Sequence, residues 1–366
     1  MPDILTAELP EGQRATFKEL FVQPSLTLGR YLLFDAVESA SLHEQQATLL
    51  FFLDLAMTLG RTLVLPRCRL RRLLANGTPS AEADYAPWSE LFDLGRLSTV
   101  HPAIPIESFL AAHGRVDLLV LAAPETCIST PGATFEQTIN GLTAVPVMRS
   151  ECGVARTPAA LHPLSHAAIG FVGSADFLEP GRAAQLRPHV RFERSVYGEA
   201  AAFVTERFQG QAYVAVHWSL APSYATLDGG TAAAVPQSAH DVARHSRRLM
   251  KRHGVRKAFL VTDALERAEL AQVYAKLQPV RYMSVVGDHT LRDLVRRDHV
   301  EIAICAMADY FLGTHASRFT ESVLEERATT FGLDAATADE MDDNHNSTVL
   351  PSDGRKPQAR HLKDEL

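Results

Sequence analysis

The chain has 366 residues, of which 46% are hydrophobic and 22% are charged, and its formal net charge is -7. This length exceeds what one hydrophobic core usually holds, so we expect two domains in an ordinary globular protein. The acidic balance argues against a nucleic-acid partner, which would require a basic face, and four cysteines are too few for a disulfide-built scaffold.

Residues 1–208 predict a first α/β domain. A short apolar strand at 31–34 is followed by a loop and by a helix that begins near Ser41, where Ser41 and Glu44 fit a capping box. A second strand at 63–66 completes a strand, loop, helix and strand unit.

Two stretches of this half have alternative interpretations. The run 47–66 is nearly long enough to cross a membrane, but Asp54, Gly60 and Arg61 interrupt it, so no membrane span is expected. The basic run 67–72 is interpreted as a solvated loop.

The end of the first half is less regular. A strand is predicted at 118–121, and the stretch 123–165 is rich in Thr, Pro, Gly and Ser, which is typical of an irregular segment. Cys127 and Cys152 flank a loop-like part of it and could be bridged in an oxidising compartment. Helical patterns then end at residue 208, where we place the domain boundary.

Residues 209–334 predict a second α/β domain around the buried strand in 212–222. Polar residues follow this strand and two others, at 257–261 and 308–319. Because parallel strands end at one edge of a sheet, the polar residues are expected to form a ligand site there. This arrangement is typical of a nucleotide-binding half-domain.

The rest of the second half is read from periodicity. Helices are expected at 240–253, 265–277 and about 320–330. Cys305 lies in an apolar run and is expected to be a buried free thiol. Residues 335–366 have no apolar period, so we expect a disordered tail.

The two ends carry conflicting targeting signals. Residues 363–366 read KDEL, the signal that returns proteins to the endoplasmic reticulum, but residues 1–17 lack the features of a signal peptide. Either the start is misassigned or removed, or the KDEL is never read. We expect a luminal protein that binds the KDEL receptor, and the sequons at Asn76 and Asn346 agree with that compartment.

Several segments occur in an order that points to one enzyme family. They are residues 31–35, 87–94, 249–253, 261–264, 311–314, 325–327 and 332–334. Together they resemble the GDP-fucose protein O-fucosyltransferase family, most of all its protein O-fucosyltransferase 2 branch. That branch fucosylates Ser or Thr of thrombospondin type 1 repeats.

The resemblance implies a fold, a reaction and partners. The fold would be α/β of the GT-B type, with two facing Rossmann-like domains and a cleft between them. The reaction would be inverting, with GDP-fucose as donor substrate and with neither a metal nor a cofactor. The acceptor would be a folded thrombospondin type 1 repeat, in the lumen of the endoplasmic reticulum. The family also implies a disulfide between Cys127 and Cys152.

Glu38 matches the family's catalytic carboxylate, four residues before Leu42. It would take the proton of the acceptor hydroxyl as that oxygen attacks the anomeric carbon. By spacing alone, Glu38 is one of many loop carboxylates. The donor-binding positions around it are Val37, Glu38, Ser39, Ala40 and Ser41.

The second half supplies the other donor-binding positions implied by the family. They are His217, Trp218, Ser219, Asp263, Ser317, Arg318 and Phe319. From the residues alone, His217 could instead be a histidine at the edge of the core. Asp263 could be a helix N-cap, and Phe319 a packed aromatic.

This site departs from the family pattern. The family's His-Leu-Arg motif ends here in Ser219, so the arginine that would neutralise the departing diphosphate is absent. Losing one such charge costs on the order of several kcal/mol of transition-state stabilisation, and Arg318 could supply a substitute. Two function classes follow: an active fucosyltransferase, or a catalytically weak or inactive relative that binds nucleotide or protein in luminal quality control.

Overall fold

The chain folds into two compact units. The computed structural model describes residues 29–34, 42–73, 79–121, 150–152, 166–172, 178–220, 237–264, 267–283, 290–315, 317–333 and 337–341. The first unit, unit 1, comprises Met1–Arg69 and Tyr85–Arg191, and unit 2 comprises Leu70–Asp84 and Phe192–Leu366. Helix α8 (Arg194–Phe208) therefore belongs to unit 2, whereas the sequence places it before a boundary near residue 208.

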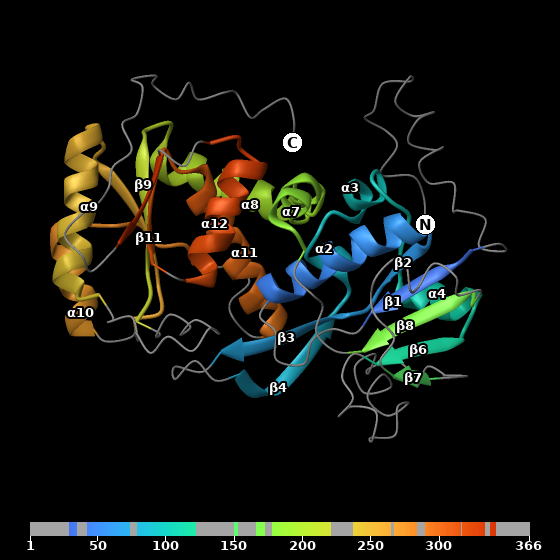
Figure 1. The fold of residues 1–366 in the computed structure, drawn as a ribbon. Coiled ribbons are helices and arrows are strands. Elements are labelled where there is room, and N and C mark those ends of the chain that lie inside the picture. The colour runs from blue at the N-terminus through green and yellow to red at the C-terminus, as the bar shows by residue number, and fades with distance from the viewer. Residues whose placement is uncertain are drawn as a thin grey trace, which may run out of the picture. The chain divides into compact units, whose positions relative to one another are not determined.

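Unit 1 is built on a six-stranded parallel sheet with the strand order β5-β2-β1-β8-β6-β7 (Figure 1). The strands are β1 (Tyr31–Phe34), β2 (Thr62–Leu65), β5 (Ala103–Pro105), β6 (Leu118–Leu121), β7 (Ser150–Cys152) and β8 (Ala168–Val172). The α-helices are α2 (Leu42–Leu59), α3 (Leu94–Ser98), α4 (Ile106–Ala112) and α7 (Pro180–Leu186), and Trp88–Glu90 and Arg187–His189 form 3-10 helices.

Strand β1 is apolar throughout because both faces of the sheet are covered. Tyr31 packs in one core cluster with Phe109 of α4, and their rings meet edge to face at 5.2 Å. Phe34, whose side chain lies on the opposite face of the strand, stacks on Phe52 of α2 with ring centroids 4.8 Å apart. The predicted strand, helix and strand unit is confirmed. No described helix is long and apolar enough to cross a membrane.

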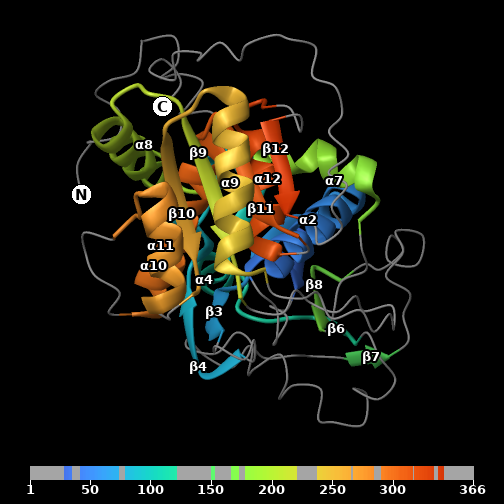
Figure 2. The same ribbon diagram turned by 90° about the vertical axis from the view of Figure 1, so that its left-hand side faces the viewer.

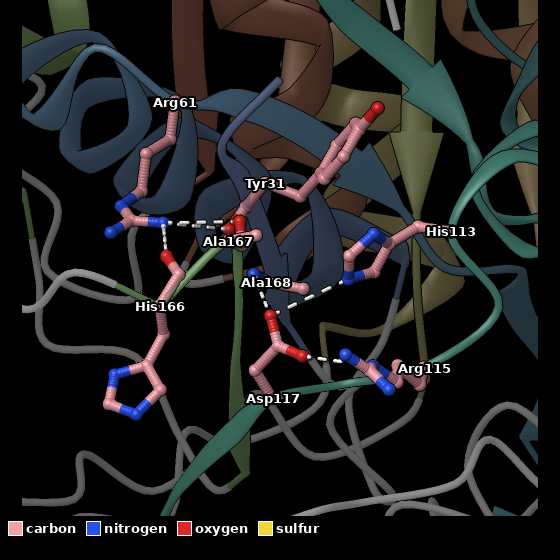
Figure 3. A network of polar contacts seen from close by, with 8 residues as sticks. All are labelled: Tyr31, Arg61, His113, Arg115, Asp117, His166, Ala167 and Ala168. Atoms are coloured by element: carbon pink, nitrogen blue, oxygen red, sulfur yellow. Dashed lines mark hydrogen bonds and ion pairs between the residues drawn. The ribbon is translucent and has the colours of Figure 1, made fainter. Parts of the chain in front are cut away.

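A partly buried polar network lies beside strands β1 and β8 of unit 1 (Figure 3). Arg61 is 2% exposed and donates a hydrogen bond from Nη1 to the carbonyl oxygen of His166 at 2.9 Å. Burial lowers the pKa of Arg61 to about 10. Asp117 accepts a hydrogen bond from the Ala168 amide at 2.9 Å and from Arg115 Nε at 3.2 Å. Arg61, which interrupts the apolar run 47–66, and Asp117 therefore form hydrogen bonds with backbone groups beside β8.

The basic run 67–72 is not a loop. It forms strand β3 (Cys68–Leu73), which pairs with β4 (Pro79–Ala86) in a two-stranded sheet. Cys68 and Leu70 are buried at 0% and 1% exposure. Apolar residues at every second position fit a strand, so the loop prediction was wrong because the arginines obscured this alternation.

Unit 2 is built on a four-stranded parallel sheet with the order β10-β9-β11-β12. The strands are β9 (Tyr213–Trp218), β10 (Lys257–Thr262), β11 (Tyr310–Thr314) and β12 (Ala338–Met341). Figures 1 and 2 show helices on both faces of this sheet. Besides α8, they are α9 (Ala239–His253) and α10 (Arg267–Leu277) on one face, with α11 (Leu291–Met307) and α12 (Arg318–Thr329) on the other.

The central strand was predicted correctly, and two other elements were not. All six residues of β9 are buried, as its continuous apolar pattern indicates. Helix α11 was missed, although Thr290 and Asp293 form a capping box at its start. Strand β12 lies within the tail that we expected to be disordered, and it pairs with β11, so that prediction was wrong for Ala338–Met341.

Cys305 is a free, fully buried cysteine, as predicted, and Cys68 is another. Burial raises the pKa of both thiols. Cys127 lies outside the described residues, as do both sequons and residues 342–366. The bridge between Cys127 and Cys152 therefore stays a prediction.

We predict that Gly313→Ala destabilises unit 2. A Cβ at Gly313 would lie 2.4 Å from Cγ2 of Thr320, so α12 would have to move away from β11. Overpacking of this kind costs about 1 to 3 kcal/mol of unfolding free energy, measurable by urea denaturation. Gly198→Ala is the matched control, because a Cβ at Gly198 in helix α8 meets nothing within 4 Å. Equal stability of Gly313→Ala and the parent protein would contradict the prediction.

Candidate functional site

The polar ends of three neighbouring strands meet at one edge of the sheet in unit 2. Strand β9 ends at His217 and Trp218, which are in register with Val261 and Thr262 of β10. Strand β11 lies on the other side of β9 and ends at Thr314. The predicted convergence of polar residues at the carboxyl edge of this sheet is confirmed.

Asp263 holds the segment that follows β9. Its carboxylate accepts hydrogen bonds from the Ser219 hydroxyl and from the Leu220 amide, each at 2.7 Å. From the other side, the Thr314 hydroxyl accepts a hydrogen bond from the Ser219 amide at 3.0 Å and donates one to the His217 carbonyl at 3.0 Å. Both neighbouring strands therefore fix the backbone at Ser219.

His217 is a buried, neutral imidazole. Its side chain stacks on the ring of Phe319 at 4.5 Å, and its Nδ1 lies 3.0 Å from Oγ1 of Thr320. Burial lowers the pKa of His217 to about 4, and the negative charge of Asp263 only partly opposes this effect. At neutral pH the ring therefore offers one hydrogen-bond donor and one acceptor but no positive charge.

The side chain of Trp218 belongs to the core and not to the polar strand ends. Its ring is fully buried in the core of unit 2, and its Nε1 donates a hydrogen bond to the carbonyl oxygen of Gln237 at 3.0 Å. Any contact between Trp218 and a bound donor would therefore have to come from its backbone.

The remaining predicted site residues are only partly described. Val37, Glu38, Ser39, Ala40 and Ser41 lie outside the described residues. The structure places Ser317 just before α12 and Arg318 at the first position of that helix, but it does not describe the Arg318 side chain. The catalytic assignment of Glu38 and the substitute charge of Arg318 thus stay predictions.

Sequence reasoning gave no side-chain role to Thr314 or Thr320. Each contributes a hydroxyl to the strand-end network, and Thr320 is 1% exposed. Thr314 was recognisable as the polar end of a strand, whereas Thr320 follows Phe319 with no signal of its own. Within the described part of the chain, no group of three or more His, Cys, Asp or Glu side chains could hold a metal ion.

We predict that His217 makes the protein less stable in mild acid. Its folded pKa of about 4 lies below the ordinary value of 6.5, so the unfolded chain takes up the proton first as the pH falls. The contribution of neutral His217 to the free energy of unfolding is fully present above pH 6.5 and is lost between pH 6.5 and 4. From about pH 7.5 to about pH 5.5, His217→Gln should lose about 1 kcal/mol less unfolding free energy than the parent in urea titrations.

The matched control is His240→Gln, the same substitution at an exposed histidine of unit 2. Equal changes in the pH dependence of the two variants would show that the burial of His217 is not the cause.

Comparison with known proteins gives matches to one family and to its fold. The sequence profile of the GDP-fucose protein O-fucosyltransferase family matches residues 31–330. A search of curated proteins finds no match to the chain. Among solved structures, POFUT1 bound to GDP-fucose has a TM-score of 0.60 at 17% identity, over 82% of this chain and 95% of that one.

Two further structures complete this comparison. POFUT1 in complex with GDP has a TM-score of 0.62 at 17% identity, over 86% of this chain and 99% of that one. The fucosyltransferase NodZ from Bradyrhizobium has a TM-score of 0.45 at 13% identity, over 81% of this chain and 93% of that one.

These findings confirm the expected fold class, and the profile match decides the family. At 17% identity, the likeness to POFUT1 shows the fold alone, which is the expected α/β class of the GT-B type. The family profile extends from β1 in unit 1 to α12 in unit 2. The chain therefore belongs to the GDP-fucose protein O-fucosyltransferase family.

Proposed function

We propose that the chain is an inverting fucosyltransferase that moves fucose from GDP-fucose to Ser or Thr of thrombospondin type 1 repeats. The observation that carries this proposal is the meeting of His217, Ser219, Asp263 and Phe319 in unit 2. These family donor-binding positions lie at the carboxyl edge of the sheet, where open α/β sheets bind their ligands. POFUT1, which shares the fold, has been solved with GDP-fucose bound.

The proposed reaction is a one-step displacement. The acceptor oxygen attacks the anomeric carbon of fucose from the face opposite the diphosphate, and the bond to GDP breaks with its electron pair. Glu38 takes the proton of the acceptor hydroxyl during this attack. The resemblance to the family implies that the reaction uses neither a metal nor a cofactor. Its position in the family pattern supports this role.

The donor is proposed to bind along the strand ends. Phe319 offers an apolar ring face. The imidazole of His217 is neutral, so it can form hydrogen bonds without repelling a nearby cation. Asp263 accepts hydrogen bonds from hydroxyl or amino groups, in competition with the two that it already receives. By resemblance to the family, residues 37–41 and 317–319 complete the set of donor-binding residues.

The proposed location is the lumen of the endoplasmic reticulum, and the KDEL receptor is the proposed partner there. Residues 363–366 and the two sequons support this address. A disulfide between Cys127 and Cys152 would agree with an oxidising compartment.

We expect Glu38→Gln to lower the transfer of labelled fucose to a folded thrombospondin repeat by about 100-fold or more, because the amide cannot accept the proton. The affinity for GDP-fucose, measured by calorimetry, should stay near that of the parent. Glu206→Gln, at an exposed carboxylate of α8, is the control and should leave transfer unchanged. Full activity of Glu38→Gln would remove Glu38 from the mechanism.

A catalytically weak or inactive relative is the second candidate, and the geometry at Ser219 favours it. The family places a guanidinium at this position, whereas here a hydroxyl donates to Asp263 at 2.7 Å. The site therefore offers no positive charge from residue 219 to the leaving diphosphate. Such a relative would bind nucleotide or folded protein in luminal quality control.

Ser219→Arg separates the two candidates. If only phosphate stabilisation is missing, a guanidinium at 219 should raise transfer about tenfold or more, because it can grip phosphate oxygens bidentately. Ser219→Gln is the control of similar length without charge, and it should not raise transfer. If Ser219→Arg binds GDP-fucose no better than the parent in calorimetry, the inactive relative becomes the better description.

A further inference from the structure

Unit 2 carries a basic groove between α9 and α10, which lie beside one another on the same face of the sheet (Figure 2). Four of its cations come from α9 and one from α10: Arg244, Arg247, Arg248, Lys251 and Lys276. The spacing of the four along α9 places them on one face of that helix. The opposite face of α9 is buried and includes Val242 and Leu249.

The charges of this groove are mostly unpaired. Arg244 donates a hydrogen bond to Asp241 at 2.8 Å. In the part of the chain that the structure describes, no carboxylate pairs with Arg247, Arg248, Lys251 or Lys276. Like charges at this helical spacing repel one another and disfavour the helix slightly. Their concentration in a chain of net charge -7 therefore suits the binding of an anion.

The groove has the size and length of a site for a short polymer. Its volume is 590 Å³, and it is an open groove, not an enclosed cavity. From Arg244 to Lys251 the cations extend over about 10 Å of helix. A single small anion would contact only part of this row, whereas a chain with several anionic groups would contact all of it.

The lining between the cations is apolar. Met250 is half-buried and Val255 is 8% exposed, and both line the groove. A uniformly charged polymer such as a polyphosphate has no apolar group to cover them. An acidic peptide does, because apolar side chains can alternate with its carboxylates, and guanidinium groups bind carboxylates bidentately.

The groove extends along α9 from His240 in its first turn to Val255 just after its end. Helix α9 leads into β10 at Lys257, so its last turns lie toward the sheet edge where the strands begin. His217 and Asp263 lie at the edge where the strands end. Arg247, Arg248 and Lys251 lie in the second half of α9, away from His217 and Asp263.

We propose that the groove between α9 and α10 binds an acidic peptide segment that carries apolar residues between its carboxylates. Arg247, Arg248, Lys251 and Lys276 pair with the carboxylates, while Met250 contacts the apolar side chains.

The test uses the full chain and a fluorescein-labelled peptide of alternating Glu and Leu residues. Fluorescence anisotropy should show binding at least about tenfold tighter than for the matched Gln and Leu peptide. The double variant Arg247→Glu and Arg248→Glu should weaken binding of the acidic peptide about tenfold or more. Met250→Gln should weaken binding of the acidic peptide but not of inorganic polyphosphate.

Arg207→Glu is the matched control, at an exposed arginine of α8, and it should bind the acidic peptide as the parent does. Equal binding of the acidic and amide peptides, or tighter binding of polyphosphate or of a sulfated oligosaccharide, would overturn the proposal. An equal loss of acidic-peptide binding in Arg207→Glu and in the double variant would also overturn the proposal. Calorimetry with GDP-fucose on the same variants tests the transferase proposal separately.

Discussion

The contact between Gly313 of β11 and Thr320 of α12 determines the arrangement at the carboxyl edge of unit 2. The hydrogen atom of Gly313 faces the Thr320 side chain at a distance that no larger residue permits. This approach brings Thr320 to His217 Nδ1 and places Phe319 against the imidazole. Thr314, one residue after Gly313, then holds the backbone of β9 where it leaves the sheet.

Each unit also contains a buried arginine that satisfies backbone carbonyl groups. Arg61 does so beside β1 and β8 in unit 1. In unit 2, Arg327 of α12 donates a hydrogen bond from Nη1 to the Ala308 carbonyl at 2.6 Å, just after α11 ends. Burial lowers the pKa of Arg327 to about 10. Because charged groups are costly to bury, these two positions tolerate little change in their surroundings.

The sequence predicted the elements whose side chains follow a clear pattern along the whole element. Strand β9 is apolar throughout and α9 is sharply amphipathic, so both were recognised. Helix α11 was not, because its residues from His299 to Ala306 are all buried and therefore show no helical period. Strand β12 reads Ala-Asp-Glu-Met and is held by main-chain pairing to β11, which leaves no side-chain pattern.

The same limit applies to the site. The place of His217 and Asp263 at the strand ends was predicted because polar residues follow buried strands. Their hydrogen-bond pairings were not predicted, because the bond from Ser219 to Asp263 spans 44 positions and that between His217 and Thr320 spans 103. Such pairs depend on the tertiary register of strands and helices, which no local pattern encodes.

The neutral ring of His217 carries one N–H proton, either on Nδ1 or on Nε2. If the Thr320 hydroxyl donates to Nδ1, the proton lies on Nε2, and that nitrogen is a donor. If Nδ1 instead carries the proton and donates to Thr320, Nε2 becomes an acceptor. The rotation of a single buried hydroxyl is therefore linked to the tautomer of the ring. A bound group that contacts Nε2 would select one tautomer and, through it, the orientation of the Thr320 hydroxyl inside α12.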